Sequence, residues 1–207
     1  MNYTSRFTTL LGECRRQMNG AVAGSMRYYG KEYGLNYGVS LSTVRDLAVA
    51  EGRDHAYACY LYQQQVREIR LASFHIAQAE RIELSHLPFW AEGIINTEVA
   101  EESSFALFQY VDHIATWLDA EDELLQYTAL LSIAKGRSCK FGDIENKLVA
   151  IMNQNSMLLA SAIVILLENY YRDSLNRAAI DRFTTSLKES NCTEYILSEF
   201  EWRKECE

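Results

Sequence analysis

Three glutamates, Glu98, Glu101 and Glu102, are spaced three and four residues apart, so on a helix their side chains share one face. Carboxylates in such a group can orient a water molecule or stabilise positive charge that develops on a substrate. They can also serve only to balance the positive end of a helix that begins at Asn96 or Thr97, with one of these two residues as the N-cap. The spacing leaves both interpretations open, and neither excludes the other.

Tyrosines and basic residues crowd the N-terminal part of the chain, where Tyr28 and Tyr29 stand between Arg27 and Lys31. Exposed aromatic rings can stack on bases, and cations contact phosphates. Tyrosines also pack between helices with the hydroxyl group at the rim, so packing is the alternative for these rings. The basic residues that we consider candidates for nucleic-acid contact are Arg6, Arg15, Arg16, Arg27 and Lys31.

Three further arginines, Arg45, Arg67 and Arg70, have acidic residues next to them in the sequence. They could line a groove that faces phosphates, or they could tie successive helices together through buried ion pairs. We favour the tie for Arg67 and Arg70, because both stand beside the apolar stripe of their predicted helix.

The residues that usually hold metals and cofactors show no recognisable pattern. The four histidines have no metal-ligand spacing, and the five cysteines are scattered, with no C-x-x-C pair. There is no glycine-rich phosphate loop. We therefore expect no metal and no cofactor, reduced thiols, and histidines that serve in packing or capping.

Helical periodicity is visible along most of the chain, which has only one proline. Apolar residues recur every three or four positions in Val66–Ala77 and in Glu121–Lys135, and Met157–Leu167 is apolar on every face. Ser40 or Ser42 is the expected cap of a helix over Thr43–Ala50. Breaks between the segments are short, which predicts an all-α protein, either stacked helical hairpins or a compact bundle.

Charge and hydropathy restrict the environment of the protein. The formal net charge of −8 arises entirely in residues 101–207, since residues 1–100 are neutral in sum. This balance argues against strong sequence-independent binding of nucleic acid. The apolar run Met157–Leu167 is much shorter than the roughly 20 residues that cross a bilayer, so we expect no membrane span and a cytoplasmic protein.

The segment from Met18 to Ile76 resembles the N-terminal part of the DNA alkylation repair enzymes, which are alkylpurine DNA glycosylases built from HEAT-like repeats. The resemblance continues more weakly to about Tyr171. The residues that carry it are Met26 and Tyr29, Tyr37-Gly38-Val39-Ser40, Val44-Arg45-x-Leu47, Leu61-Tyr62 and Arg67-Glu68-x-Arg70-Leu71-Ala72.

The resemblance implies stacked antiparallel helical hairpins, an α-solenoid of HEAT-like repeats, and we expect residues 1–207 to form a single domain of this kind. It also implies a concave surface that holds damaged double-stranded DNA. On such a surface we expect Tyr28 and Tyr29, which the resemblance favours, and Arg27, Lys31 and Arg45, chosen from their sequence context, as contacts. In that family a carboxylate stabilises the oxocarbenium character that develops on the sugar as an alkylated purine leaves.

The catalytic positions of the family fall on altered residues in this chain. The Trp-Asp-x-x-Asp segment falls on Thr97 to Glu101, which makes Glu101 the candidate acid and replaces the first tryptophan by Thr97, with Glu98 beside it. Two arginine positions carry Tyr127 and Glu168, and the second tryptophan position carries Ile165. A site for a cationic base beside phosphates needs those aromatic and basic groups, so we do not expect ordinary glycosylase activity.

Two hypotheses follow. In the first, the chain is a DNA alkylation repair enzyme-like protein that binds damaged DNA, with hydrolysis of the N-glycosidic bond of N-alkylated purines left open as an activity. In the second, it is a catalytically silent HEAT-repeat scaffold whose surface binds a protein partner.

Overall fold

The computed structural model describes residues 3–31, 33–188 and 190–205. These residues are mostly helical, and they contain no β-strand apart from an isolated parallel bridge between Leu35 and Val66. Close Cα packing divides the chain into two compact units, residues 1–107 and 108–207. Each unit is described by itself below.

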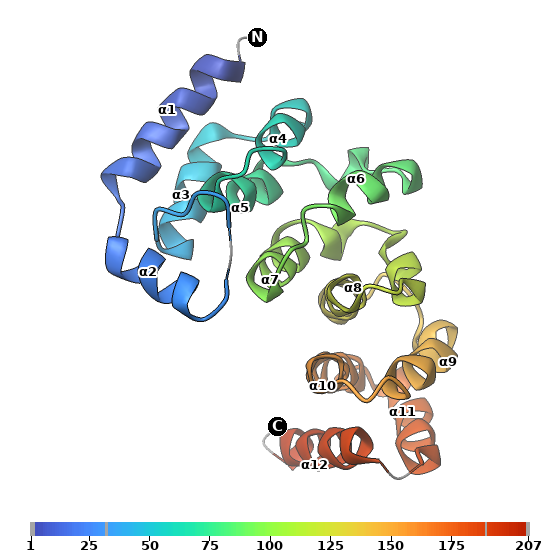
Figure 1. The fold of residues 1–207 in the computed structure, drawn as a ribbon. Coiled ribbons are helices and arrows are strands. Elements are labelled where there is room, and N and C mark those ends of the chain that lie inside the picture. Colours follow the sequence, from blue (N-terminus) through green and yellow to red (C-terminus); the bar gives the residue numbers. More distant parts are fainter. Residues whose placement is uncertain (1–2, 32, 189, 206–207) are drawn as a thin grey trace. The chain divides into compact units, whose positions relative to one another are not determined.

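The first unit contains seven named α-helices and two short 3₁₀ helices in its described residues (Figure 1). Helix α5 packs against α3, α4 and α7, so helices from successive hairpins lie side by side. The elements are α1 (Tyr3–Arg16), α2 (Gly20–Tyr28), α3 (Leu41–Glu51), α4 (His55–Tyr62), α5 (Arg67–Ile76), η1 (Ala79–Arg81), η2 (Leu84–His86), α6 (Leu87–Ala91) and α7 (Thr97–Ala106).

The second unit repeats this arrangement, with α10 packed against α8 and α12 and with shorter helices beside them. This order of alternate helices is that of stacked hairpins. The elements are η3 (Phe108–Tyr110), η4 (Ile114–Asp119), α8 (Glu123–Gly136), α9 (Phe141–Met152), α10 (Met157–Tyr171), α11 (Ser174–Ser186) and α12 (Asn191–Glu205).

Local sequence signals account for several helix ends. The side chain of Ser40 accepts a hydrogen bond from the backbone of Thr43, which makes it the N-cap of α3 as predicted. Gly38, in the preceding loop, has a φ of 71°. A side chain there would collide with the carbonyl oxygen of Asn19, so the turn needs glycine both for its dihedral angle and for its close packing.

The periodic segments of the sequence are helices in the structure. Val66–Ala77 corresponds to α5, Glu121–Lys135 to α8, and the apolar run beginning at Met157 to α10. Helix α10 is covered on most sides, and Ala162, Ile163, Leu166 and Leu167 have no exposed surface. The all-α prediction is therefore confirmed.

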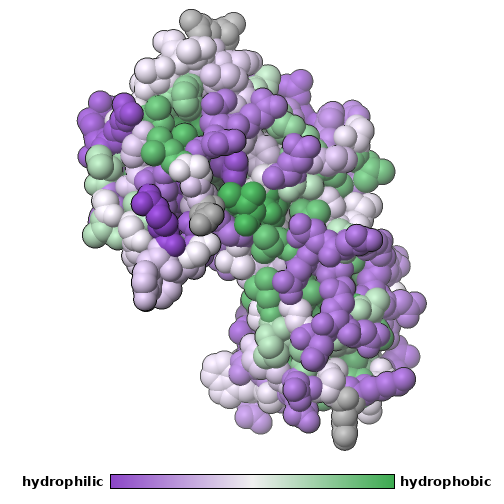
Figure 2. Space-filling view, in the orientation of Figure 1, coloured by the Kyte–Doolittle hydropathy of each residue, from purple (hydrophilic) through white to green (hydrophobic). Residues whose placement is uncertain are grey.

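Polar residues surround the apolar groups on the face of the molecule shown in Figure 2, where hydrophobic side chains form several separate patches. None of the helices in the described part of the chain combines the length and the low polarity that crossing a bilayer requires. The four described cysteines, Cys14, Cys59, Cys139 and Cys192, are free thiols, and Cys206 lies outside the described residues.

Candidate functional site

Helix α7 presents its three glutamates in two different environments. The side chain of Asn96 accepts a hydrogen bond from the backbone of Val99 and caps the helix, one of the two predicted alternatives. Thr97, the first helical residue, is half-buried. Glu98 and Glu102 are 7% and 3% exposed, whereas Glu101 lies on the exposed side of the helix. The three side chains therefore do not share one environment as the spacing predicted, because two point into the interior and one faces solvent.

Glu98 is held by an arginine and a tyrosine from earlier elements. Arg67, on α5, places its Nε 2.9 Å and its Nη2 2.5 Å from the two carboxylate oxygens, and the hydroxyl group of Tyr33 donates to the same carboxylate. Burial alone would raise the pKa of Glu98, but the hydrogen bonds from Arg67 and Tyr33 outweigh it and lower the pKa. Glu98 is therefore a fixed anion that pairs with Arg67.

Glu102 is held in the same way by Arg45 and His75. Arg45 makes two parallel hydrogen bonds to it, 2.8 Å from Nε and 2.6 Å from Nη2, and Nε2 of His75 lies 2.5 Å from Oε1. Burial favours the protonated acid, but the hydrogen bonds from Arg45 and His75 prevail and lower the pKa of Glu102 to about 2. Arg45, predicted as a DNA contact, thus has its guanidinium engaged by a carboxylate.

A fully buried acid on α5, Glu68, fixes the loop that leads into α3. Its carboxylate accepts hydrogen bonds from the backbone N–H groups of Tyr37 and Val39, each at 3.2 Å, and from Nη1 of Arg67 at 3.0 Å. Nη1 of Arg67 also donates to the carbonyl oxygen of Val39. Arg67, 1% exposed, therefore joins α5, α7 and the loop before α3, which confirms the predicted tie for this residue.

Not every basic residue behaves as predicted. Arg6 was expected to be available for nucleic acid, but its guanidinium lies 3.2 Å from Glu51 and 2.7 Å from Asp54, 45 and 48 residues away in sequence. For Arg70, Nε is buried without a hydrogen-bond partner, and the guanidinium lies 6.0 Å from the ring centre of Tyr62. A buried ion pair is therefore not what holds Arg70 in the described part of the chain.

A surface at the end of α2 combines cations with exposed rings. We call Arg27, Tyr28, Tyr29 and Lys31 the cationic aromatic cluster. Tyr28 and Tyr29 are 83% and 77% exposed and meet edge to face with ring centres 5.2 Å apart. Arg27 is exposed and Lys31 is half-buried. These four residues were all predicted as DNA contacts, and the structure brings them together on the surface of the first unit.

A recess of about 210 Å³ opens beside this cluster, lined by Ala23, Arg27, Lys31, Tyr33 and Asn36. Among the residues that the structure describes, no carboxylate lines this recess, and the hydroxyl group of Tyr33 donates to Glu98. A small recess with two cations in its wall suits an anion such as a phosphate group.

The remaining predicted pocket residues belong to the second unit. Tyr127 is buried in α8, and Ile165 is half-buried in α10. Glu168, also on α10, lies 2.8 Å from Nη2 of Arg172 and 2.5 Å from Nη1 of Arg203 on α12. Glu168 thus joins two helices of this unit through ion pairs.

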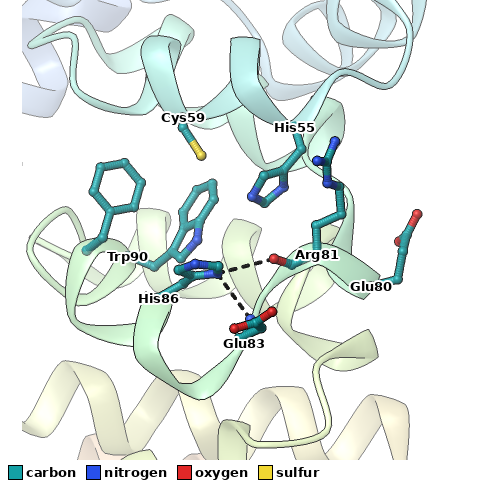
Figure 3. A pocket seen from close by; sticks show the side chains of 8 residues that line it. His55, Cys59, Glu80, Arg81, Glu83, His86 and Trp90 are labelled. Atoms are coloured by element: carbon teal, nitrogen blue, oxygen red, sulfur yellow. Dashed lines mark hydrogen bonds between the residues drawn. The ribbon is translucent and has the colours of Figure 1, made fainter.

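The sequence analysis did not identify a larger pocket in the first unit, which Figure 3 shows from close by. Its volume is about 650 Å³, and two of the four histidines line it, His55 and His86. We call it the α4–α6 pocket. Its other lining residues are Cys59, Glu80, Arg81, Glu83, Phe89 and Trp90. The sequence feature that could have indicated this pocket is the spacing of His55 and Cys59, which lie one helical turn apart on α4.

Metal ligation is not indicated in the part of the chain that the structure describes, because no three His, Cys, Asp or Glu side chains come together there as a metal site would require. The pairs formed by Glu98 and Glu102 account for two of the three carboxylates on α7. Glu101 is the carboxylate of that helix that faces solvent.

No protein-family model matches this chain, and no curated protein matches it in sequence. A solved structure does match, from work on "a new family of proteins related to the HEAT-like repeat DNA glycosylases with affinity for branched DNA structures". The TM-score is 0.70, with 13% sequence identity over 95% of this chain and 94% of that one. At this identity the similarity establishes the fold, and the predicted HEAT-like repeat architecture is confirmed.

Proposed function

We propose that this protein binds double-stranded DNA that is distorted by a lesion or a branch point, and that the cationic aromatic cluster of Arg27, Tyr28, Tyr29 and Lys31 makes the central contact. The observation that carries the proposal is the exposure of two neighbouring tyrosine rings between two cations. Aromatic rings stack on bases that a distortion has unstacked, and cations hold the backbone beside them. The affinity of the structurally similar protein for branched DNA supports this class of ligand.

The recess beside the cluster gives the contact a defined geometry. Arg27 and Lys31 both line it, so a backbone phosphate seated there lies between two positive charges. The loop that carries Tyr33 is held from behind by Glu98, and the loop residues Tyr37 and Val39 are held by Glu68. A rigid support of this kind reduces the conformational entropy that binding would otherwise cost.

In the described part of the first unit, Arg6, Arg16 and Arg45 pair with carboxylates, so their charges are partly neutralised. The acidic charge of residues 101–207 further opposes attraction of a uniform polyanion. We therefore expect modest affinity for intact duplex DNA and a clear preference for distorted DNA, where ring stacking adds to the electrostatic contribution.

Base excision, if the protein performs it, requires a carboxylate that can approach a sugar. Glu101 is the candidate on α7, because Glu98 and Glu102 are buried in ion pairs with Arg67 and Arg45. Its role would be to stabilise positive charge on the sugar and to orient a water molecule. Release of an N-alkylated purine that persists unchanged in Glu101→Gln would eliminate Glu101 as that acid.

The binding test is a fluorescence-anisotropy titration at low and at higher salt, with an intact duplex, a duplex carrying an abasic-site analogue and a four-way junction. The double variant Arg27→Gln/Lys31→Gln is compared with Arg53→Gln/Arg182→Gln, which removes two exposed cations elsewhere. We expect roughly tenfold or greater loss of affinity and a salt slope smaller by about 2 in the first variant only.

Equal losses in the two double variants would show that net charge, not the cluster, determines binding. No binding to any of the three DNAs at micromolar protein in low salt would overturn the proposal and favour the alternative, a HEAT-repeat scaffold that binds a protein partner.

A further inference from the structure

The α4–α6 pocket has the features of a small-molecule site. Its volume of about 650 Å³ lies in the range of ligand pockets, and its wall is assembled from α4, the two 3₁₀ helices and α6. The described residues that line it include none of those in the cationic aromatic cluster or in the recess beside that cluster, so the two sites are separate. A ligand bound here would not compete with the proposed DNA contact for the same residues.

The inner part of the pocket is apolar and aromatic. Trp90 is fully buried at its base, and Phe89 packs against it with ring centres 5.4 Å apart. The ring of His55 lies 6.2 Å from that of Trp90, and Cys59 projects from the same helix one turn further on (Figure 3). Burial raises the pKa of the Cys59 thiol, so at neutral pH this group is uncharged and packs as an apolar side chain. These walls suit a flat, uncharged ring.

The imidazole of His55 is held in a form that offers a hydrogen-bond donor. Nδ1 of His55 accepts from the backbone N–H group of Gln78 at 3.4 Å, whereas Nδ1 of His86 lies 3.2 Å from both the backbone nitrogen of Glu83 and the carbonyl oxygen of Arg81. The neutral ring of His55 then has its proton on Nε2. Burial, together with the nearby positive charge of Arg81, lowers the pKa of His55, which keeps that ring neutral at pH 7.

The rim of the pocket has one cation and two acids. Arg81 makes no ion pair with any residue that the structure describes, although Glu80 and Glu83 line the same pocket. In Figure 3, the side chain of Glu80 extends away from Cys59 and Trp90. The guanidinium of Arg81 and the Nε2–H group of His55 can hold a single phosphate or carboxylate group, while the two carboxylates disfavour a ligand with a higher negative charge.

We propose that the α4–α6 pocket binds a nucleoside monophosphate, with the base against Phe89 and Cys59 and the phosphate group at Arg81. A nucleoside lacks the phosphate group that would pair with Arg81. Inorganic phosphate lacks the ring that would pack against the aromatic wall. A triphosphate adds charge that Glu80 and Glu83 repel. The pocket therefore selects for one ring and one phosphate group together.

The test is isothermal titration calorimetry of the full chain with adenosine monophosphate, thymidine monophosphate, adenosine, inorganic phosphate and adenosine triphosphate. We expect the two monophosphates to bind at least tenfold more tightly than the other three compounds. Arg81→Gln is expected to lower the monophosphate affinity at least tenfold. Arg53→Gln, which removes an exposed arginine outside the pocket, is expected to leave it unchanged.

Circular dichroism shows whether each variant is folded; the side chain of Arg81 is exposed, so the fold does not depend on it. The proposal is overturned if no monophosphate binds at millimolar concentration, if Arg81→Gln binds as tightly as the parent, or if inorganic phosphate alone accounts for the affinity. DNA binding by the cationic aromatic cluster is measured separately, so either proposal can fail without the other.

Discussion

The interiors of the two units are built differently. In the first unit, Arg67, Glu68, Glu98 and Glu102 are buried and joined to one another or to partners on the rim. In the described residues of the second unit, the fully buried polar side chains are uncharged, and ion pairs such as that of Glu168 lie nearer the surface. Among the described residues, the interior of the second unit is therefore held mainly by apolar packing, whereas that of the first also depends on charge pairing.

This difference shows how the first unit supports its surface. Apolar packing is non-directional, but a buried ion pair constrains the position of both partners. Arg67 and Glu68 use this to fix the loop of residues 33–40 and α7 relative to α5. The cationic aromatic cluster stands immediately before that loop. The charged interior thus costs desolvation free energy but holds the candidate binding surface in place.

The largest effect is expected from Arg67→Met, which tests whether the first unit depends on its buried ion pairs. This substitution leaves Glu68 and Glu98 buried without their cation. We expect a loss of about 3–5 kcal/mol in the free energy of unfolding. Chemical denaturation followed by circular dichroism measures it, and hydrogen exchange should localise the loosening to α7 and residues 33–40.

The double variant Arg67→Met/Glu98→Leu tests the same dependence on charge pairing. It replaces the ion pair between α5 and α7 by apolar groups like those of the second unit. We expect it to recover a large part of the lost stability. If Arg67→Met alone lowered the free energy of unfolding by less than about 1 kcal/mol, buried ion pairs would not distinguish the first unit from the second.

A smaller effect is expected from acid, through Glu102. The pKa of this carboxyl is about 2 in the folded protein, below its ordinary value of 4.5, so the ionised form stabilises the fold. That contribution is present above pH 4.5 and is lost as the pH falls toward 2; it amounts to at most about 3 kcal/mol. Chemical denaturation of the parent and of Glu102→Gln is followed from pH 7 to pH 3. The difference between their free energies of unfolding should decrease below pH 4.5.

The matched control for Glu102 is Glu101→Gln, which removes the same charge from the exposed side of the same helix. If the difference in the free energy of unfolding between the parent and Glu102→Gln stayed constant over the whole pH range, the ionised carboxylate would not be the source of the stabilisation.

The smallest effect is expected in the second unit from Glu168→Gln, which breaks the pairs with Arg172 and Arg203. These arginines are 50% and 33% exposed at their side chains, so solvent screens the interaction. We expect a loss below about 1 kcal/mol in the free energy of unfolding by chemical denaturation. A cost equal to that of Arg67→Met would mean that ion pairs are as important to the second unit as to the first.

Local features of the fold could be predicted from the sequence because they depend on neighbouring residues. The helix over Val66–Ala77 follows from apolar periodicity, and the structure places α5 at Arg67–Ile76. The Ser40 cap and the Asn96 cap each involve a backbone N–H group three residues further on. The HEAT-like architecture followed from the resemblance of Met18–Ile76 to one family, together with short breaks between helices.

The candidate site was only partly predictable. Tyr28 and Tyr29 were identified as contacts and are exposed, yet the same reasoning placed Arg6 among the available cations. Arg6 pairs with Glu51 and Asp54, which lie more than 40 residues away, and no periodicity specifies such a partner. The α4–α6 pocket was missed for the same reason, since its wall combines residues from four short elements.

The sequence by itself determined the helices and their caps, because each depends on groups within about one helical turn. Only the tertiary structure decided which carboxylate of α7 faces solvent. Glu98, Glu101 and Glu102 are equivalent by spacing, but Arg67 and Arg45 reach α7 from positions 31 and 57 residues earlier and bury two of the three. The physical reason is that a charge can enter the interior only where a partner compensates it, and the packing of α3 and α5 decides where that partner stands.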